Sequence, residues 1–566
     1  MIVASPSYRL TASRLAGGRF QTGDSLVSIS QRGARGSAFK LDAAILPLPG
    51  APAAREVSPG AAAAREALTT IHEQVRRESD RLVESWRDVI AREDFLPSAR
   101  NLADYLALRR QDLSALQAYL SALGLSSLGR CESHVMANLD AVAAALARIC
   151  GGEPEPFPDP ELWSEGALRV REQRRVLFGR GSGAAIMVTL PSEAASDPLL
   201  VDGYVAAGMD CARINCAHDS PLVWRAMVEQ VRRAAERHGR TCRILMDLPG
   251  PKCRIESLSP ERPGRVQVGD RLRLAQRLTA ATPTGLPVVA VSLPQVVASL
   301  AVGAPVWIDG GKIRGRVAAV EGGDRIVEIV GARRKGGKLR TQKGVNFPGA
   351  PLDLPPLSDD DLAALPVVAE CADLIGFSFV QRPRDIVALD RALAAARPAA
   401  PPIPLVLKIE TLEAVRNLPR LLVQAAGSRP TAAMIARGDL AVELGHVSLA
   451  EIQEEILRLC EAARIPVVWA THALDDLVKD GLPSHAETAD ATMAQRAECV
   501  LLNKGPLVAE AIGFLAEIIG KTGRRQAKKT APLAPLHSWP LEALALAAAP
   551  VPDADGAPVT IEARIR

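Results

Sequence analysis

Between residues 61 and 151, apolar residues recur every three or four positions, in the stretches ALTTIHEQVRRESDRLVESWRDVI, LADYLALRRQDLSALQAYLSAL and VMANLDAVAAALARI. That spacing places them along one side of a helix. The pattern therefore predicts an all-helical amino-terminal module of three or more amphipathic helices. The Pro-rich stretch GGEPEPFPDPE follows, and we expect it to end the module and open a linker over residues 152–184.

After residue 184 the pattern changes to short apolar runs, rich in β-branched residues, that alternate with helical stretches. Such alternation is typical of parallel strands joined by crossover helices. Eight runs are present: AIMVT ending at Thr189, CARIN at Asn215, RILMD at Asp247, LIGFSF at Phe379, LVLKIE at Glu410, AAMIA at Ala436, PVVWA at Ala470 and CVLLN at Asn503. Eight β/α units in series predict an α/β protein with a closed (β/α)8 barrel, built from residues 185–250 and 345–523.

An insertion over residues 251–344 separates the third run from the fourth and is rich in Val, Arg and Gly. It predicts a small β-barrel domain that acts as a lid and excludes water from a site on the barrel. Residues 1–60 and 524–566 are expected to be disordered or poorly structured. Residues 1–55 contain only two acids, Asp24 and Asp42, so a targeting segment or a start codon placed too early stays open.

The net charge, the length of the apolar runs and the cysteine content limit which kinds of partner and site this chain can have. The net charge is +4 over 566 residues, which gives no field suited to nucleic acid. No run approaches the roughly 18 to 20 apolar residues that cross a bilayer. The nine cysteines are scattered, and their odd number argues against a disulfide framework. They form no CxxC pair and no His spacing suits zinc. We therefore expect a cytoplasmic protein with small-molecule partners, possible homo-oligomerisation, no nucleic acid and no membrane.

Charged residues stand at the carboxy ends of the predicted strands, where barrel enzymes place their chemistry. Lys408 and Glu410 are two apart, so both point to the same side of their strand. The next strand runs into Gly438 and Asp439. Glu410 and Asp439 could share one Mg²⁺ or Mn²⁺, because Mg²⁺ takes one or two carboxylates beside substrate oxygens. The alternative is a buried ion pair between neighbouring strands.

Two further predicted strands add cationic and polar groups at their carboxy ends, namely Arg213, Asn215 and Asp247. Arginine binds phosphoryl oxygens bidentately, whereas Lys408 is a point charge that can follow a moving group. Phosphoryl transfer needs mainly positioning, metal and positive charge. The basic stretch GARRKGGKLRTQKG is either a solvated hairpin or a nucleotide-phosphate contact.

Eight segments, taken in order, resemble the pyruvate kinase family: GMDCARINCAH, ILMDLPGPKCRI, VWIDGGKI, KGVNFPGAPLDLPPLSDDD, LIGFSFV, LKIE, IARGDLAVE and PVVWATHAL. The resemblance covers roughly residues 185 to 520. It implies a Mg²⁺-dependent phosphotransferase that moves a phosphoryl group from phosphoenolpyruvate to ADP and gives pyruvate and ATP.

The resemblance also implies roles for individual residues. Glu410 and Asp439 match the metal ligands, and Lys408 matches the lysine that stabilises the phosphoryl group in transfer. Arg213 matches the arginine on the phosphate, and Thr471 the threonine beside the enolate protonation site. Further substrate contacts are implied at Gly438, Asp439 and Ser378, and nucleotide contacts at Pro191, His218, Arg254 and Lys343.

The chain departs from the family where many members bind K⁺. Asn215 and Asp247 remain, but Ala217 and Leu248 replace a serine and a threonine, and Lys252 replaces a hinge glutamate. A lysine ammonium can supply the missing charge, so K⁺ is not expected to be required.

Two other departures concern the proton donor. The family segment ATQML has become ATHAL with His472, and SGETA has become Asn503, Lys504 and Gly505. After about Gly523 the usual carboxy-terminal domain is not expected, which argues against sugar-phosphate control and leaves the oligomeric state, the effector and the nucleotide preference open. Two rival functions are weighed: a non-catalytic regulatory homologue, and a Mg²⁺-dependent lyase or aldolase acting on pyruvate enolate without nucleotide. The lid domain and the retained Lys408, Arg254 and Lys343 favour the kinase.

Overall fold

The computed structural model describes residues 60–151, 156–260, 264–279, 285–350, 354–398, 400–522 and Trp539. The chain divides into two compact units, residues 1–55 and 56–566. The first unit lies wholly outside the described residues, as do nearly all of the two terminal segments expected to be disordered. The structure below is therefore that of the second unit.

Eight parallel strands form a closed barrel. In chain order they are β1 (Ala185–Thr189), β2 (Cys211–Asn215), β3 (Arg243–Asp247), β13 (Leu374–Phe377), β14 (Leu405–Ile409), β15 (Thr431–Ala436), β16 (Val467–Ala470) and β17 (Cys499–Leu502). Each falls in one of the eight predicted runs, so the predicted (β/α)8 fold is confirmed. Pairing of Asn215 with Asp247 and of Ala436 with Ala470 sets the carboxy ends of these strands level.

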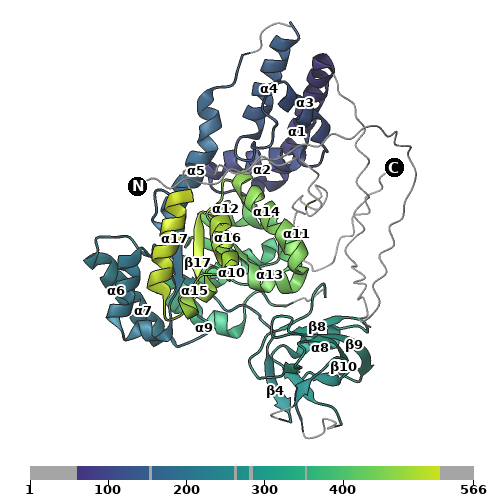
Figure 1. The fold of residues 1–566 in the computed structure, drawn as a ribbon, viewed down its shortest axis with the longest axis vertical. Helices are drawn as coiled ribbons and strands as arrows, with labels where there is room; N and C mark the ends of the chain where they lie inside the picture. The colour runs from purple at the N-terminus through teal and green to yellow at the C-terminus, as the bar shows by residue number, and fades with distance from the viewer. Residues whose placement is uncertain are drawn as a thin grey trace, which may run out of the picture. The chain divides into compact units, whose positions relative to one another are not determined.

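Helices surround the barrel strands (Figure 1). Those of the barrel are α6 (Pro198–Ala207), α7 (Pro221–Arg237), α9 (Asp359–Cys371), α10 (Pro383–Ala396), α11 (Leu412–Arg416), α12 (Leu418–Ala426), α13 (Arg437–Leu444), α14 (His446–Ala462), α15 (Asp475–Asp480), α16 (His485–Ala494) and α17 (Val508–Thr522). Capping boxes begin two of them: Ser358 pairs with Asp361 at α9, and Ser484 with Glu487 at α16.

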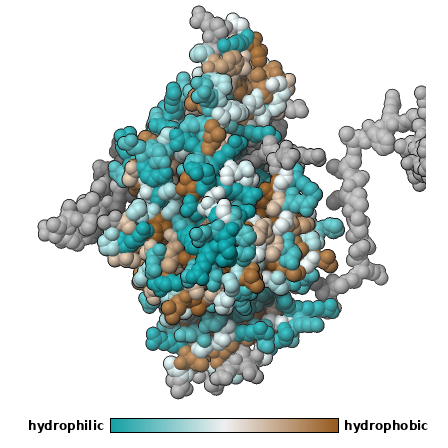
Figure 2. Space-filling view, turned by 90° about the vertical axis from the view of Figure 1, so that its left-hand side faces the viewer, coloured by the Kyte–Doolittle hydropathy of each residue, from teal (hydrophilic) through white to brown (hydrophobic). Residues whose placement is uncertain are grey.

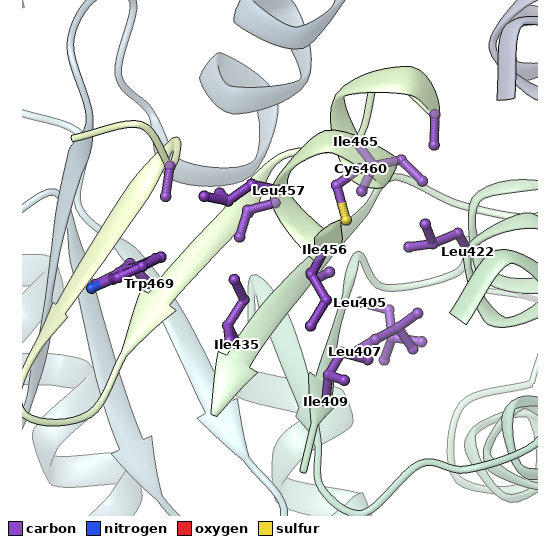
Figure 3. Close-up of a cluster of buried hydrophobic side chains, with 14 of the residues drawn as sticks. Leu405, Leu407, Ile409, Leu422, Ile435, Ile456, Leu457, Cys460, Ile465 and Trp469 are labelled. Atoms are coloured by element: carbon purple, nitrogen blue, oxygen red, sulfur yellow. The ribbon is translucent and has the colours of Figure 1, made fainter. Parts of the chain in front are cut away.

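The barrel strands are buried on both faces, which explains their nearly continuous apolar sequence. One set of strand side chains, Leu405, Leu407, Ile409, Ile435 and Trp469, faces the helices. It belongs to one apolar cluster with Leu422 of α12, Ile456, Leu457 and Cys460 of α14, and Ile465 (Figure 3). The alternate set fills the barrel interior and includes Val406, Met434 and Val468. Leu177 and Phe178, which precede the first strand, belong to this interior cluster and are fully buried.

The predicted helical module is confirmed. It contains α1 (Ala61–Trp86), α2 (Leu96–Leu108), α3 (Ser114–Ala122) and α4 (Val135–Ile149), with 3₁₀ turns at Arg87–Val89 and Glu93–Phe95. The segment expected as a linker contains a further helix, α5 (Pro160–Phe178). Asp159 caps its first turn by accepting from Glu161 N, Pro160 opens it, and Gly179 ends it at φ 73°.

The module is fixed to the amino-terminal end of the barrel. Asn101 Nδ2 donates to Ala462 O at 2.8 Å, at the end of the helix that precedes β16. Arg92 N donates to Gly427 O at 2.8 Å, at the end of the helix that precedes β15. A Cβ at residue 427 would lie 2.5 Å from Val89 O, so the close approach requires glycine. The carboxy ends of β15 and β16 therefore remain clear of the module.

The inserted segment forms the expected β sheet, which extends past the expected boundary at residue 344 to Asn346. Its seven-stranded, barrel-like sheet has the order β12-β8-β9-β10-β6-β7-β4. The strands are β4 (Ile255–Ser259), β6 (Arg271–Ala275), β7 (Val288–Val291), β8 (Pro305–Ile308), β9 (Ile313–Glu321), β10 (Asp324–Ala332) and β12 (Val345–Asn346). Helix α8 (Pro294–Ser299) and a two-stranded sheet of β5 (Arg265–Val266) and β11 (Gly337–Lys338) complete it. The domain has its own apolar core, and an Arg254–Gly344 bridge joins its entry and exit segments.

The surface mixes hydrophilic residues with smaller apolar patches (Figure 2). Within the described residues, no helix has both the length and the apolar content that a membrane span requires. Trp539 is buried, and its indole nitrogen donates to Val415 O on α11.

Candidate active site

Lys408 lies at the centre of a buried polar cluster at the carboxy end of the barrel. Its Nζ donates to Ser378 Oγ at 2.6 Å and to Asp247 Oδ2 at 3.2 Å, and lies 3.3 Å from Glu410 Oε1. These partners follow or end strands β13, β3 and β14. Burial alone would lower the pKa of Lys408, but the carboxylates of Asp247 and Glu410 raise it above its ordinary value. The lysine is therefore held charged.

Arg213 and Asp247 form a close ion pair beside this lysine. Arg213 Nε and Nη2 lie 2.8 and 2.5 Å from Asp247 Oδ2, and Nη1 donates to Thr189 Oγ1 at 2.9 Å. Burial would raise the pKa of Asp247, yet Lys408 and Arg213 hold it below the ordinary value. A Cβ at Gly376 would lie 2.5 Å from Asp247 Oδ1, so this carboxylate fits only because residue 376 has no side chain.

Glu410 is 3% exposed and belongs to a pair of neighbouring carboxylates. Burial raises its pKa, Asp439 raises it further, and Lys408 and Lys252 oppose the rise. Phe379 N donates to Glu410 Oε2 at 2.6 Å, from a residue held at φ 55°. The charge of Asp439 thus acts on Glu410, the other candidate metal ligand.

The hinge of the inserted domain also reaches this cluster. Lys252 Nζ lies 2.6 Å from Asp439 Oδ1, and about one quarter of each side chain is exposed. Asn215 Oδ1 instead accepts from Ala217 N at 3.2 Å. Among the described residues, no ion pair or hydrogen bond joins Lys252 to Asn215 or Asp247. Lys252, expected to supply the charge of a monovalent cation, therefore pairs with Asp439 and not with the retained Asn215 and Asp247.

Thr471, which follows β16, and Gly438, in the first turn of α13, are brought together. Gly438 N donates to Thr471 Oγ1 at 2.8 Å. Arg437 fixes the same loop: it donates to Ala470 O at 3.0 Å and also to Thr471 O, and its guanidinium pairs with Asp490 Oδ1 at 2.5 Å. A backbone donor and a hydroxyl are thereby held beside Asp439.

The residues predicted to contact the nucleotide lie in two places, on the barrel and on the inserted domain. His218 lines a cavity of about 240 Å³ with Arg213, Asn215, Asn503 and Lys504, and Pro191 directly follows Leu190 of the same lining. Lys343 and Arg254 lie on the inserted domain. There Lys343 Nζ is 3.1 Å from Asp309 Oδ1, and Arg254 Nη1 donates to Gln342 O at 3.2 Å.

A second polar cluster, which no sequence motif indicates, surrounds Asp475. Asp475, in the first turn of α15, contacts His472, Asn503 and Lys479 at 3.3, 3.1 and 3.3 Å. The hydrogen bond with His472 is the largest of several causes that lower the pKa of Asp475 to about 2. In the sequence, His472 and Asn503 stand out only as departures from the family pattern, and no spacing rule joins Asp475 to Asn503, 28 positions further on.

The carboxylate oxygens available at this site suit one divalent cation whose remaining ligands come from a substrate. No group of three or more His, Cys, Asp or Glu side chains arranged for a metal is found in the described part of the chain. Glu410 and Asp439 supply two hard carboxylates whose proximity raises the pKa of Glu410, and a divalent cation would relieve that repulsion. The residues present therefore fit Mg²⁺ or Mn²⁺.

Comparisons with known proteins place this arrangement in context. The family description "Pyruvate kinase, barrel domain" matches residues 183–506. A protein named pyruvate kinase from Agrobacterium vitis is 31% identical over 399 residues, which are 68% of this chain and 80% of that protein. The pyruvate kinase of Geobacillus stearothermophilus is 33% identical over 291 residues, 51% of this chain and 47% of that protein. The match thus spans about half of the Geobacillus relative and about four fifths of the Agrobacterium one.

Proposed function

The chain belongs to the pyruvate kinase family, and from that membership we propose that it transfers the phosphoryl group of phosphoenolpyruvate to ADP, giving pyruvate and ATP. The observation that carries the proposal is Lys408, a buried lysine held charged between Asp247 and Glu410 with Asp439 close by. A buried cation beside two carboxylates is costly for a purely structural protein, but phosphoryl transfer needs it.

In this proposal Glu410 and Asp439 would hold Mg²⁺ or Mn²⁺, which would supply positive charge to the transferring phosphoryl group. Arg213 and Lys408 bind the same phosphate. The backbone N–H of Gly438 and the hydroxyls of Thr471 and Ser378 orient the rest of phosphoenolpyruvate.

Lys408 stabilises the transition state, because its ammonium faces the position at which negative charge develops. Asp247 positions both Lys408 and Arg213 and keeps them charged. ADP is held through Pro191 and His218 on the barrel and through Arg254 and Lys343 when the inserted domain closes over the site. Closure excludes water, which would otherwise compete with ADP for the phosphoryl group.

We include independence of K⁺ in the proposal. Lys252 places a fixed ammonium 2.6 Å from Asp439, so the site carries its own monovalent charge. The proposal does not require Lys252 to occupy the place of the ion between Asn215 and Asp247.

The test is a coupled assay on purified full-length protein with phosphoenolpyruvate, ADP and Mg²⁺. Pyruvate is followed through lactate dehydrogenase, and ATP is followed separately through hexokinase. Equal formation of pyruvate and ATP, dependent on ADP, is the expected result. Pyruvate-enolate chemistry without ADP would replace the proposal by the lyase, and phosphoenolpyruvate binding without turnover would replace it by the regulatory homologue.

A further inference from the structure

A small cavity lies between the helical module and the amino-terminal end of the barrel. Its volume is about 170 Å³, and its lining includes the start of α2, the middle of α5, and residues that begin β15 or precede β16. Helix α2 packs against α14, and α5 contacts β15, so both parts of the chain contribute walls (Figure 1). The candidate active site is at the other end of the same strands.

Arg464, between α14 and β16, lines this cavity and is only 7% exposed. Its Nε and Nη2 donate to Ser133 O at 3.3 and 3.1 Å. Its third nitrogen, Nη1, is buried and has no hydrogen-bond partner in the described part of the chain; Glu165 Oε1 forms only an ion pair with it at 3.5 Å. A buried guanidinium N–H without an acceptor is costly. This nitrogen therefore indicates a place for an acceptor that the chain itself does not supply.

Arg464 shares the carboxylate of Glu165 with a second arginine of the cavity lining. Arg169 Nε donates to Glu165 Oε1 at 2.8 Å, and Arg169 Nη1 donates to Asp94 O at 3.0 Å. One negative charge therefore serves two guanidinium groups. Burial lowers the pKa of Arg464, even though the charges of Glu165 and Asp104 act in the opposite direction. The nearby carboxylates thus leave part of the desolvation of Arg464 uncompensated.

Two carboxylates, Asp94 and Glu172, also line the cavity, but each has an arginine of its own. Asp94 accepts from Arg92 Nε at 3.2 Å and from Arg92 Nη2 at 2.5 Å. Glu172 accepts from Arg175 Nε at 2.9 Å and from Arg175 Nη2 at 2.6 Å. With Glu165, the set then holds three carboxylates against four arginines: Arg92, Arg169, Arg175 and Arg464. One positive charge is therefore unbalanced within this set.

The lining and the size of the cavity define the chemical class of its ligand. A guanidinium group offers N–H donors whose geometry matches the oxygens of a carboxylate or a phosphate. Phe95, Ala426 and Ile465 add apolar surface, which suits carbon atoms rather than a bare inorganic ion. The volume is below the roughly 300 Å³ at which pockets for drug-sized ligands begin, so a nucleotide is too large.

We propose that this cavity binds a small organic anion, whose carboxylate or phosphate group accepts from Arg464 and Arg169 and whose short carbon skeleton lies against Phe95 and Ile465. The site is separate from the proposed reaction and does not depend on it. Arg464 belongs to the barrel and Arg169 to α5, so the bound anion joins the two parts of the chain. A ligand that binds only the folded protein also stabilises it against unfolding.

The test is calorimetric titration of the full-length protein with butyrate and, separately, with propyl phosphate, at constant ionic strength in chloride. These probes have similar carbon chains, so the comparison shows which anionic group the site prefers. At least one probe should bind with a Kd of about 1 mM or tighter and raise the Tm. Arg464→Gln and Arg169→Gln should each weaken binding by at least about tenfold. Arg171→Gln removes the same charge from an exposed position on α5 and should leave the Kd unchanged.

Lys408→Met distinguishes this cavity from the candidate active site, whose cations attract the same probes. Binding that persists in Lys408→Met and is weakened in the arginine variants supports the proposal. If Arg464→Gln does not fold, Arg169→Gln decides, because the Arg169 side chain is 36% exposed and its loss disturbs the core less. The proposal is overturned if neither probe binds the wild type, if Arg169→Gln binds as tightly as the wild type, or if Lys408→Met abolishes binding.

Discussion

Lys252 and Asp439 form an ion pair of 2.6 Å that links the hinge of the inserted domain to one of the two candidate metal ligands. Because this ammonium already stands beside Asp439, the proposed function includes activity without an added monovalent cation. Activity should be the same in K⁺ and in a bulky organic cation, as measured by the coupled assay in each salt.

Lys252→Gln tests the same relationship directly. Removing the ammonium should lower kcat by at least about tenfold, since a charge next to the transferring group is lost. Lys521→Gln removes an exposed lysine on α17 and should leave the rate unchanged. A many-fold stimulation of the wild type by K⁺, but not by the organic cation, would contradict the prediction.

Lys408→Met should reduce phosphoryl transfer by at least about a hundredfold, because it removes charge stabilisation of the transition state. Binding of phosphoenolpyruvate with Mg²⁺ should remain measurable by calorimetry, since Arg213, Glu410 and Asp439 are unchanged. The variant should also unfold at lower urea concentration, because Asp247 and Glu410 lose a shared buried partner. Unchanged turnover would refute the role given to Lys408.

Glu443 on α13 gives a prediction about pH. Burial and the nearby charge of Asp439 raise its pKa to about 7, so the folded protein keeps a proton that the unfolded chain releases near pH 4.5. Stability should therefore fall as pH rises from about 4.5 to about 7 and then level off. Glu443→Gln should be more stable than the wild type at pH 8, by on the order of 2 kcal/mol, and equally stable near pH 4.5.

Thermal unfolding at the two pH values checks this, with Glu451→Gln, an exposed glutamate on α14, as the control. A stability difference of the same size at both pH values would mean that packing, rather than protonation, distinguishes the variant.

Asn101 fixes the helical module to the barrel. Its amide donates to Glu132 O and Ala462 O, and its oxygen accepts from Val135 N. Asn101→Ala removes these three buried hydrogen bonds and should destabilise the protein by about 1–3 kcal/mol, measured by urea unfolding.

The control for this variant is Gln74→Ala, which removes a single contact with Glu78 on the surface of α1. It should cost roughly 0.5 kcal/mol or less. Equal losses for the two variants would show that the Asn101 contacts do not hold the module in place.

The sequence predicts the barrel well because its strands are buried on both faces and so stand out as apolar runs. Lys408 and Glu410 could be placed on one side of a strand because their spacing matches the period of two. The ion pair of Lys252 with Asp439 joins positions 187 apart, and no local pattern indicates it. Helix α5 lies in the segment expected as a linker. It was not predicted, because the Pro-rich stretch just before it indicates a linker rather than the capped start of a helix.

Leu177 and Phe178 show that the limits of sequence similarity are not the limits of an independent folding unit. The family match begins at residue 183, yet these two side chains, just upstream, are part of the barrel's interior. A barrel excised at that boundary would lack two of the side chains that fill its interior, and a cavity would remain in their place. A fragment that is meant to contain the complete barrel must therefore include the end of α5. The same residues belong in any comparison of this barrel with those of its relatives.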